Sequence, residues 1–314
     1  MADYSAASAK RQGRDMTTEL HGVIPITATP FDAAGQVDEA SIETLVEFEA
    51  RCGVHGLNVL GIMGEAHKLS ETERRRVAEV FVKCAAGRFP IVVGTSHGGT
   101  AVAIELSRAA EAAGAAAVMV APPIGLRGDA AILAHYRAVA GPIGIPLVVQ
   151  DEPVTTGVLM SPELLVRIAT EIPACLYVKL EEPPTPTKIT AMRRLPGGAG
   201  VRIFGGMNAM YFCEELSRGA VGIMTGVAVP DVLVRIYTAF AGGDRADAVA
   251  IFDRYASYIR YEGQQGIGLA LRKEVLRLRG AIRTSVVRQP GPVLDDVTRR
   301  ELGDILARCG LLEG

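Results

Sequence analysis

The stretch Cys175-Leu176-Tyr177-Val178-Lys179-Leu180-Glu181-Glu182 is apolar until it ends in two carboxylates, and prolines flank it on both sides. This pattern predicts a short buried strand with Lys179 near its carboxyl end. Because desolvation disfavours the charged form of an amine, a buried lysine tends towards the neutral form, which attacks a ketone to give a Schiff base. The alternative is an ordinary ion pair of Lys179 with Glu181 or Glu182, or a side chain that extends to water at the end of the strand.

Lys179 stands out among the six lysines of the chain because it is the one that lies in an apolar strand. The others lie in segments predicted as arm, loop or helix, where an ammonium group is expected to reach water. These are Lys10, Lys68, Lys83, Lys188 and Lys273. Lys179 is therefore the first candidate for covalent chemistry.

Short apolar runs alternate with amphipathic helical patterns on both sides of this strand. The runs are Gly22 to Thr27, Gly56 to Gly61, Pro90 to Gly94, Ala116 to Ala121, Ile145 to Gln150, Val201 to Gly205 and Val221 to Thr225. Their spacing of roughly 25 to 35 residues suits one strand plus one crossover helix. About eight such units favour a (β/α)8 TIM barrel over an open doubly wound sheet. The glycine-rich nucleotide-binding fingerprints of the open sheet are also missing.

The chain is expected to have three parts. Residues 1–20 are small and polar and are predicted to form a loose arm, residues 21–242 to form the barrel, and residues 243–314 to form a C-terminal helical extension packed on it. No linker rich in proline, glycine or serine marks a separate domain.

Composition narrows the class of protein. A hydrophobic fraction of 49%, a charged fraction of 22% and a net charge of -2 fit an ordinary globular protein and disfavour a nucleic-acid partner. The five cysteines have no CxxC pairing and the histidines no ligand spacing, which argues against disulfides and metal. No apolar run approaches the roughly 20 residues that span a bilayer, so a cytoplasmic protein without membrane contact is expected.

The carboxyl ends of the strands are where a barrel of this kind places its active site. Side chains alternate along a strand, so Tyr177, Lys179 and Glu181 are expected to share one face. Gln150 and Glu152 share a face at the end of the preceding strand. The candidates for proton transfer are Tyr177, Glu152, Glu181 and a water held by Gln150. Glu181 is assigned first because it shares a face with Lys179.

The second candidate is the glycine-bracketed turn Gly61-Ile62-Met63-Gly64-Glu65 after the second strand. Exposed backbone N–H groups in such a turn can bind a carboxylate, and Gly64 permits close approach of a ligand. The alternative is a simple strand-to-helix turn. Glu65 has an alternative of its own, as a local pairing or capping residue.

Several motifs recur in a familiar order along the chain. They are Thr29-Pro30-Phe31, Gly61-x-x-Gly64-Glu65, Leu69-Ser70-x-x-Glu73-Arg74, Gly94, Pro122-Pro123, Pro153, Thr156-Gly157 and Lys179. The sequence thus resembles the dihydrodipicolinate synthase / N-acetylneuraminate lyase superfamily of class I pyruvate-type aldolases. The resemblance implies a homo-oligomer, dimer or tetramer, in which Lys179 forms a Schiff base with a 2-oxo acid. It places the carboxylate-binding turn at Ile62 and Met63 and implies no cofactor.

The departures from this family are informative. Ile62 and Met63 stand where hydroxyl residues are usual, and Gln150 replaces the tyrosine that relays protons. Ile124 follows Pro122-Pro123 where the synthases have a tyrosine, and Thr155 replaces their arginine. These differences argue against an authentic dihydrodipicolinate synthase and suggest a less polar pocket.

The expected function is a Schiff-base lyase or aldolase acting on a 2-oxo acid. A dehydratase of a 2-oxo-3-deoxy sugar acid and a non-catalytic 2-oxo acid binding protein are the alternatives, although a costly buried amine favours catalysis. The catalytic residues are predicted to be Lys179, Glu181 and Gln150, and the substrate-binding residues Ile62, Met63, Gly64, Thr155, Gly206 and Thr225. His97 and Asn208 complete the rim.

Overall fold

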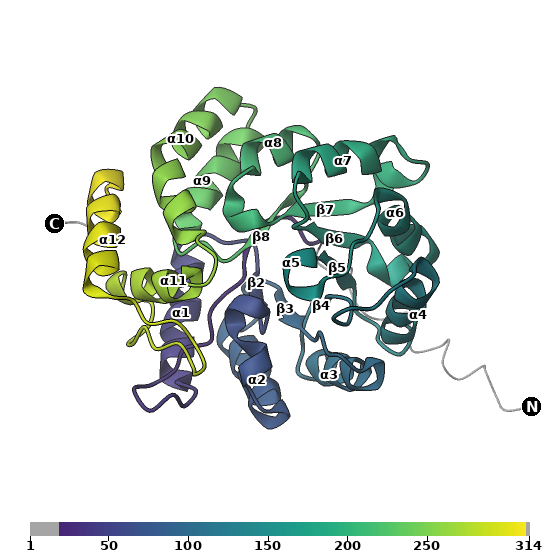
Figure 1. Cartoon of the computed structure of the whole chain (residues 1–314), viewed down its shortest axis with the longest axis horizontal. Helices are drawn as coiled ribbons and strands as arrows, with labels where there is room; N and C mark the ends of the chain where they lie inside the picture. The colour runs from purple at the N-terminus through teal and green to yellow at the C-terminus, as the bar shows by residue number, and fades with distance from the viewer. Residues whose placement is uncertain (1–18, 312–314) are drawn as a thin grey trace, which may run out of the picture.

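The computed structural model describes residues 19–311. Most of the predicted arm, residues 1–18, lies outside the described residues, as do residues 312–314. The described chain forms a ring of strands surrounded by helices (Figure 1). The strands are β1 (Gly22–Pro25), β2 (Leu57–Val59), β3 (Ile91–Gly94), β4 (Ala117–Val120), β5 (Leu147–Asp151), β6 (Tyr177–Leu180), β7 (Arg202–Gly205) and β8 (Gly222–Thr225).

The eight strands are parallel and follow the order β1-β8-β7-β6-β5-β4-β3-β2. The first and last strands of this order meet where Ile26, directly after β1, forms an isolated parallel bridge with Asn58 of β2. There the Thr27 amide donates a hydrogen bond of 2.9 Å to the Asn58 carbonyl. The sheet is therefore a nearly closed barrel, and the predicted (β/α)8 fold is confirmed.

Helices cover the outside of the strands (Figure 1). They are α1 (Glu39–Arg51), α2 (Glu71–Ala85), α3 (Thr100–Ala112), α4 (Asp129–Ala140), α6 (Pro162–Glu171), α7 (Thr185–Arg194), α8 (Phe212–Ser217) and α9 (Pro230–Ala241). The single turn α5 (Pro153–Thr156) follows β5 and lies within the ring of outer helices (Figure 1). Local sequence sets their starts: Ser70 and Glu73 form a capping box at α2, and Ser161 caps α6 ahead of Pro162.

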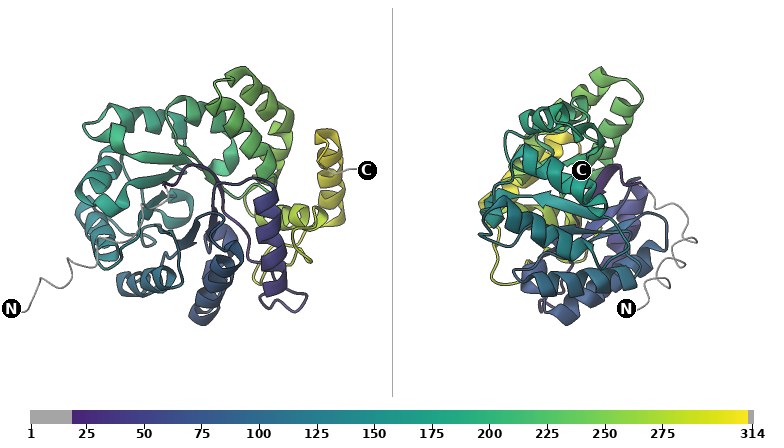
Figure 2. Two further views of the ribbon diagram at one scale, coloured as in Figure 1. Left: turned by 180° about the vertical axis from the view of Figure 1, so that it is seen from behind. Right: turned by 90° about the vertical axis from the view of Figure 1, so that its right-hand side faces the viewer.

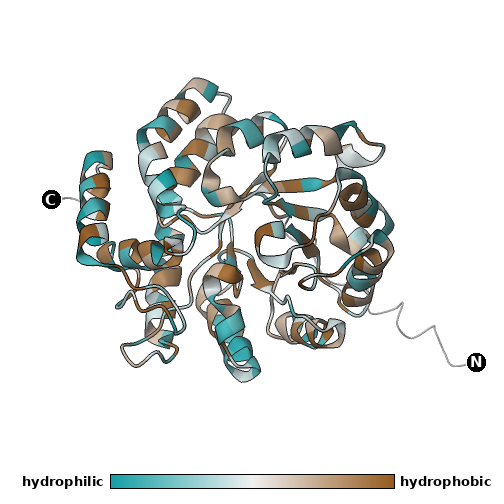
Figure 3. Cartoon of the chain, viewed as in Figure 1, coloured by the Kyte–Doolittle hydropathy of each residue, from teal (hydrophilic) through white to brown (hydrophobic). Residues whose placement is uncertain are grey.

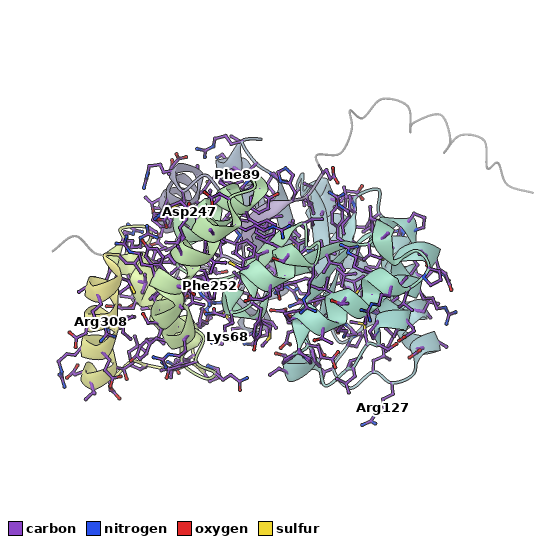
Figure 4. All side chains as sticks on the ribbon, turned by 90° about the horizontal axis from the view of Figure 1, so that it is seen from above. Lys68, Phe89, Arg127, Asp247, Phe252 and Arg308 are labelled. Carbon is purple, nitrogen blue, oxygen red and sulfur yellow. The ribbon has the colours of Figure 1, made fainter. Side chains whose placement is uncertain are left out.

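Three further helices follow the barrel: α10 (Arg245–Glu262), α11 (Gly268–Leu278) and α12 (Asp296–Cys309). α10 packs on α9, and α12 lies beside α10 on one side of the molecule (Figures 1 and 2). Phe252 on α10 and Arg308 on α12 mark this side in Figure 4, whereas Arg127 points away from the opposite side. The division at residue 243 into barrel and extension remains a prediction.

Hydrophobic side chains lie both inside the barrel and between the strands and helices, while the outer helix faces are polar (Figure 3). The inner cluster includes Ile24, Met119, Phe204 and Tyr177. The Tyr177 hydroxyl accepts a hydrogen bond of 3.2 Å from the Leu20 amide, which enters before β1. Tyr177 is therefore bound at the amino-terminal end of the barrel and does not take part in a site at the carboxyl ends.

The expectation that the other lysines reach water was wrong for Lys188 and Lys273, and the side chain of Lys68 is only 10% exposed. Lys273 on α11 is fully buried and pairs with Glu65 at 2.5 Å. The Lys188 side chain is 8% exposed and pairs with Asp151 at 2.6 Å. A carboxylate partner compensates the desolvation of each ammonium group, which polarity along the sequence did not reveal. Within residues 19–311 no helix is both long and apolar enough to cross a membrane.

Candidate active site

Lys179 and Gln150 lie side by side at the carboxyl ends of β6 and β5, where they are paired in register. The Lys179 side chain is 4% exposed, and its Nζ lies 2.7 Å from Oε2 of Glu181. Gln150 donates a hydrogen bond of 2.9 Å from Nε2 to the same oxygen. The ion pair considered as the alternative is therefore present, and it places an amine, a carboxylate and an amide in direct contact.

These three residues open into a cavity of about 410 Å³ above the strand ends. Ile62, Met63, Thr155 and Thr225, all predicted to bind substrate, also line it. With Lys179, Glu181 and Gln150 included, seven of the residues predicted from sequence to form the site line this one cavity.

Gly64 and Gly206 support the cavity rather than line it. The Gly64 carbonyl accepts a hydrogen bond of 2.6 Å from the buried Thr29 hydroxyl, which holds the turn from below. A Cβ atom at Gly206 would lie 2.6 Å from Cγ of Glu181. A side chain at position 206 would thus displace Glu181 from its contact with Lys179.

The turn after β2 is a short 3-10 helix, Ile62–Gly64, between two residues in the left-handed region, Leu60 at φ 58° and Glu65 at φ 56°. The first N–H groups of a helical turn have no intrahelical acceptor. The amides of Ile62 and Met63 therefore have no acceptor within this turn. Backbone N–H groups can donate hydrogen bonds to an anion even where the side chains, as at Ile62 and Met63, are apolar.

Glu65 is fully buried and holds the turn to the C-terminal segments. It pairs with Lys273 at 2.5 Å and with Lys68 at 2.9 Å, and it accepts a hydrogen bond of 3.0 Å from the Arg288 amide. Of the two structural roles considered for Glu65, ion pairing is the one that is observed.

Glu152 lines the cavity but is engaged as the N-cap of α5. Its Oε2 accepts a hydrogen bond of 2.9 Å from the Thr155 amide, and burial raises the pKa of its carboxyl group. Glu181 is the carboxylate that contacts Lys179 directly, so it remains the first candidate for proton transfer.

A second hollow, of about 630 Å³, lies next to the first and is largely apolar. Ile62, Met119, Gln150 and Thr155 line both spaces. His97 belongs to this second hollow, where its Nδ1 accepts a hydrogen bond of 3.0 Å from the Gly99 amide. His97 is not among the residues that line the cavity of Lys179, whereas Asn208 is.

The far wall of the first cavity comes from the C-terminal segments, which the sequence analysis left out of the site. Glu262, Gln264 and Arg272 line the wall together with Asn208 from the loop after β7. One feature of the sequence could have indicated this wall. Arg272 and Lys273 are adjacent charged residues within the apolar pattern of α11, where charges are unexpected. The expectation of a less polar pocket therefore describes the second hollow better than the cavity of Lys179.

Residues 19–309 match the model of the dihydrodipicolinate synthetase family. The chain belongs to this family. The L-2-keto-3-deoxyarabonate dehydratase of Azospirillum brasilense is 34% identical over 93% of this chain and 95% of its own length. The 4-hydroxy-tetrahydrodipicolinate synthase of Phenylobacterium zucineum is 35% identical over 75% of this chain and 79% of its own length.

A solved structure shares both sequence and fold with this family member. The dihydrodipicolinate synthase of Rhodopseudomonas palustris superposes with a TM-score of 0.89 at 38% identity, covering 94% of this chain and 100% of that one. The family resemblance predicted from the motifs is confirmed, and a pyruvate-type lyase function fits it. Within the described residues no group of three histidine, cysteine, aspartate or glutamate side chains could hold a metal ion.

Proposed function

We propose that this protein is a lyase that acts on a 2-oxo acid through a Schiff base at Lys179. The amine attacks the C2 ketone, and the resulting carbinolamine loses water to give an iminium ion. The observation that carries the proposal is the contact of Lys179 with Glu181 in a cavity at the carboxyl ends of the strands. Glu181 can take the ammonium proton and supply it to the departing water.

The substrate carboxylate is assigned to the turn after β2. Ile62 and Met63 line the cavity of Lys179, and their amides, at the start of a helical turn, are the two donors that we assign to the anion. Thr29 and Glu65 hold this turn from beneath, so the donors are preorganised.

Loss of water from a 2-oxo-3-deoxy sugar acid is the reaction that we favour. The far wall of the cavity carries Asn208, Gln264 and Arg272, which suit a hydroxylated chain better than an apolar aldehyde. A similar relative, the Azospirillum protein, is an L-2-keto-3-deoxyarabonate dehydratase.

Glu181 has a defined part in this reaction. Its carboxylate takes a proton from C3 of the iminium, and the electron pair moves to the nitrogen to form an enamine. The enamine expels the C4 hydroxyl group, which leaves as water with the proton held by Glu181. Hydrolysis of the remaining imine returns Lys179 and releases the product. Gln150 keeps the Glu181 carboxylate in place by its hydrogen bond.

Aldol cleavage is the second candidate, because the same iminium permits carbon–carbon cleavage with release of pyruvate. Gln150 cannot relay protons as the tyrosine expected at this position does, which disfavours this reaction. We therefore propose that the chain is not an authentic dihydrodipicolinate synthase.

The assembly and compartment are part of the proposal. Ile124, 78% exposed beside Pro122-Pro123, and Leu159, 70% exposed, suit a homo-oligomer, dimer or tetramer. All five cysteines are free thiols, which suits the reducing cytoplasm.

Borohydride reduction in the presence of pyruvate tests the proposal. A mass gain on the peptide of Lys179, absent from the peptides of Lys188 and Lys273 and from the Lys179→Ala protein, is expected. Identification of the product then separates the two reactions, since cleavage releases pyruvate whereas dehydration leaves the carbon skeleton intact. Failure to trap an adduct with any 2-oxo acid of a five- and six-carbon panel would reject the Schiff base.

A further inference from the structure

Arg272 reaches from α11 in the C-terminal segment into the mouth of the barrel. Its side chain is 5% exposed and lies directly over Gly226, which follows β8. A Cβ atom at Gly226 would lie 2.6 Å from Nη1 of Arg272. A glycine at this strand end is therefore required for the guanidinium group to sit against the cavity.

Two of the three guanidinium nitrogens have acceptors. Nε donates a hydrogen bond of 2.6 Å to Oε1 of Glu262, and Nη2 donates one of 2.8 Å to Oδ1 of Asn208. Nη1 is buried and has no acceptor among residues 19–311. A buried donor without a partner is costly, so Nη1 is the atom at which Arg272, a residue of the cavity wall, still lacks a hydrogen-bond acceptor.

The backbone that carries Asn208 is strained. Met207, Asn208 and Ala209 have φ values of 41°, 52° and 63°, a run of left-handed residues without a glycine. The Asn208 side chain is fixed at its other end, because Nδ2 donates a hydrogen bond of 2.7 Å to the Ile259 carbonyl. Such strain is found where a side chain must be held in a defined place, and here that place is beside Arg272.

The charge of Arg272 is already balanced. Glu262 is fully buried, pairs with Arg272 at 2.6 Å and also accepts from the Ala228 amide. A second carboxylate at Nη1 would leave one buried negative charge in excess, whereas a neutral oxygen would not. The matching acceptor is therefore a hydroxyl group.

We propose that Nη1 of Arg272 binds a hydroxyl group of the substrate at the end remote from the imine carbon, and that Arg272 thereby selects hydroxylated 2-oxo acids. This inference rests on the proposed function. Arg272 takes no part in forming the imine, so a small 2-oxo acid that does not extend to the far wall does not need it.

The test compares paired substrates in the wild-type protein and in the Glu262→Gln/Arg272→Gln double variant, which removes both charges together. Each pair is a five- or six-carbon 2-oxo-3-deoxy sugar acid and its analogue without the terminal hydroxyl. The wild-type protein is expected to prefer the hydroxylated member in kcat/KM by about 10- to 100-fold, the range of a hydrogen bond to a charged donor. In the double variant this preference falls to about one.

Borohydride trapping with pyruvate is run on the same proteins. Equal labelling of Lys179 in wild type and double variant shows that the fold and the imine chemistry survive, so that a loss of preference is assigned to Arg272. Arg277→Gln, which removes a half-exposed arginine of the same helix, is the matched control and keeps the wild-type preference. An unchanged preference in a double variant that still forms the adduct would overturn the inference alone. Absence of the adduct in the wild type would overturn the proposed function with it.

Discussion

Glu65 and Lys273 form an ion pair of 2.5 Å in which both side chains are fully buried. The pair joins the turn after β2 to α11, two segments far apart in the chain. Lys273 is also next to Arg272, so one turn of α11 both anchors the proposed carboxylate site and supplies the far wall of the cavity. The extension is thus part of the site rather than an appendage of the barrel.

The first prediction concerns this pair. Lys273→Met is expected to lower the free energy of unfolding by about 3 kcal/mol, because it leaves a buried carboxylate with fewer partners. Chemical denaturation measures the change. Arg76→Gln, which breaks the exposed pair with Glu39, is the control and is expected to change the free energy of unfolding much less, because solvent screens an exposed ion pair. An equal decrease in the free energy of unfolding in the two variants would show that the buried pair of Lys273 stabilises the fold no more than an exposed pair does.

The second prediction concerns Glu181. Glu181→Gln keeps the size of the side chain but cannot carry a proton, so kcat is expected to fall by about 10²- to 10⁴-fold. Borohydride trapping of pyruvate on Lys179 should still occur in this variant but more slowly, because Glu181 also assists imine formation. Glu182→Gln is the matched control, since Glu182 pairs with Lys188 and is not among the residues that line the cavity. A fully active Glu181→Gln protein would remove Glu181 from the mechanism.

The third prediction concerns Thr29, whose hydroxyl donates to the Gly64 carbonyl at 2.6 Å. Thr29→Val preserves the shape and removes this hydrogen bond, which is worth about 1 kcal/mol. The turn should then hold the substrate carboxylate less well, and KM should rise by about 5-fold with kcat nearly unchanged. Steady-state kinetics separates the two constants. A fall in kcat with constant KM would show that the turn serves the chemical step instead.

The fourth prediction concerns pH. A hydrogen bond from Arg283 lowers the pKa of Asp38 from 3.8 to about 2. A carboxylate whose pKa is lower in the folded state stabilises the fold above its unfolded pKa, and this stabilisation is lost as the pH falls through the folded value. The stability difference between wild type and Asp38→Asn is therefore expected to be full above about pH 4 and to vanish towards about pH 2.

Thermal unfolding at several pH values measures this difference. Asp244→Asn is the control, because Asp244 caps α10 through the Asp247 amide and forms no ion pair within residues 19–311. A difference for Asp38→Asn that does not change with pH would show that the ion pair with Arg283 has no effect on stability.

The fifth prediction concerns Ile124. Ile124→Glu places a charge on an exposed apolar position and is expected to weaken association of the subunits, as measured by light scattering after gel filtration. Val293→Glu, equally exposed at 78%, is the control and should leave the assembly intact. A monomeric wild-type protein would contradict the proposed oligomer.

The barrel could be predicted from sequence because its signals are local. Each buried parallel strand is a short apolar run, and helix starts such as Ser70 and Ser161 have cap residues that act within one turn. The alternation of side chains along β6 also placed Glu181 beside Lys179.

The far wall and the buried lysines could not be predicted in the same way. Arg272 reaches the cavity from α11 because its side chain lies against Gly226, which follows β8, and Lys273 is buried because Glu65, on a distant turn, pairs with it there. Neither contact has a periodic signature, since both depend on how segments far apart in the chain come together. The charges in α11 indicated an unusual environment, but not which carboxylates would balance them.

Lys179 and Gln150 both contact Oε2 of Glu181, and this arrangement affects how Lys179 reacts with small electrophiles other than the substrate. An ammonium group held in an ion pair is not a nucleophile, and Gln150 fixes the carboxylate that holds it. An aldehyde or other small electrophile that drifts into the cavity thus meets a masked lysine. Under the proposed mechanism, a substrate whose carboxylate binds at the turn after β2 would stay long enough for imine formation at Lys179. The resting protein is in this sense safeguarded against accidental alkylation of the residue on which its chemistry depends.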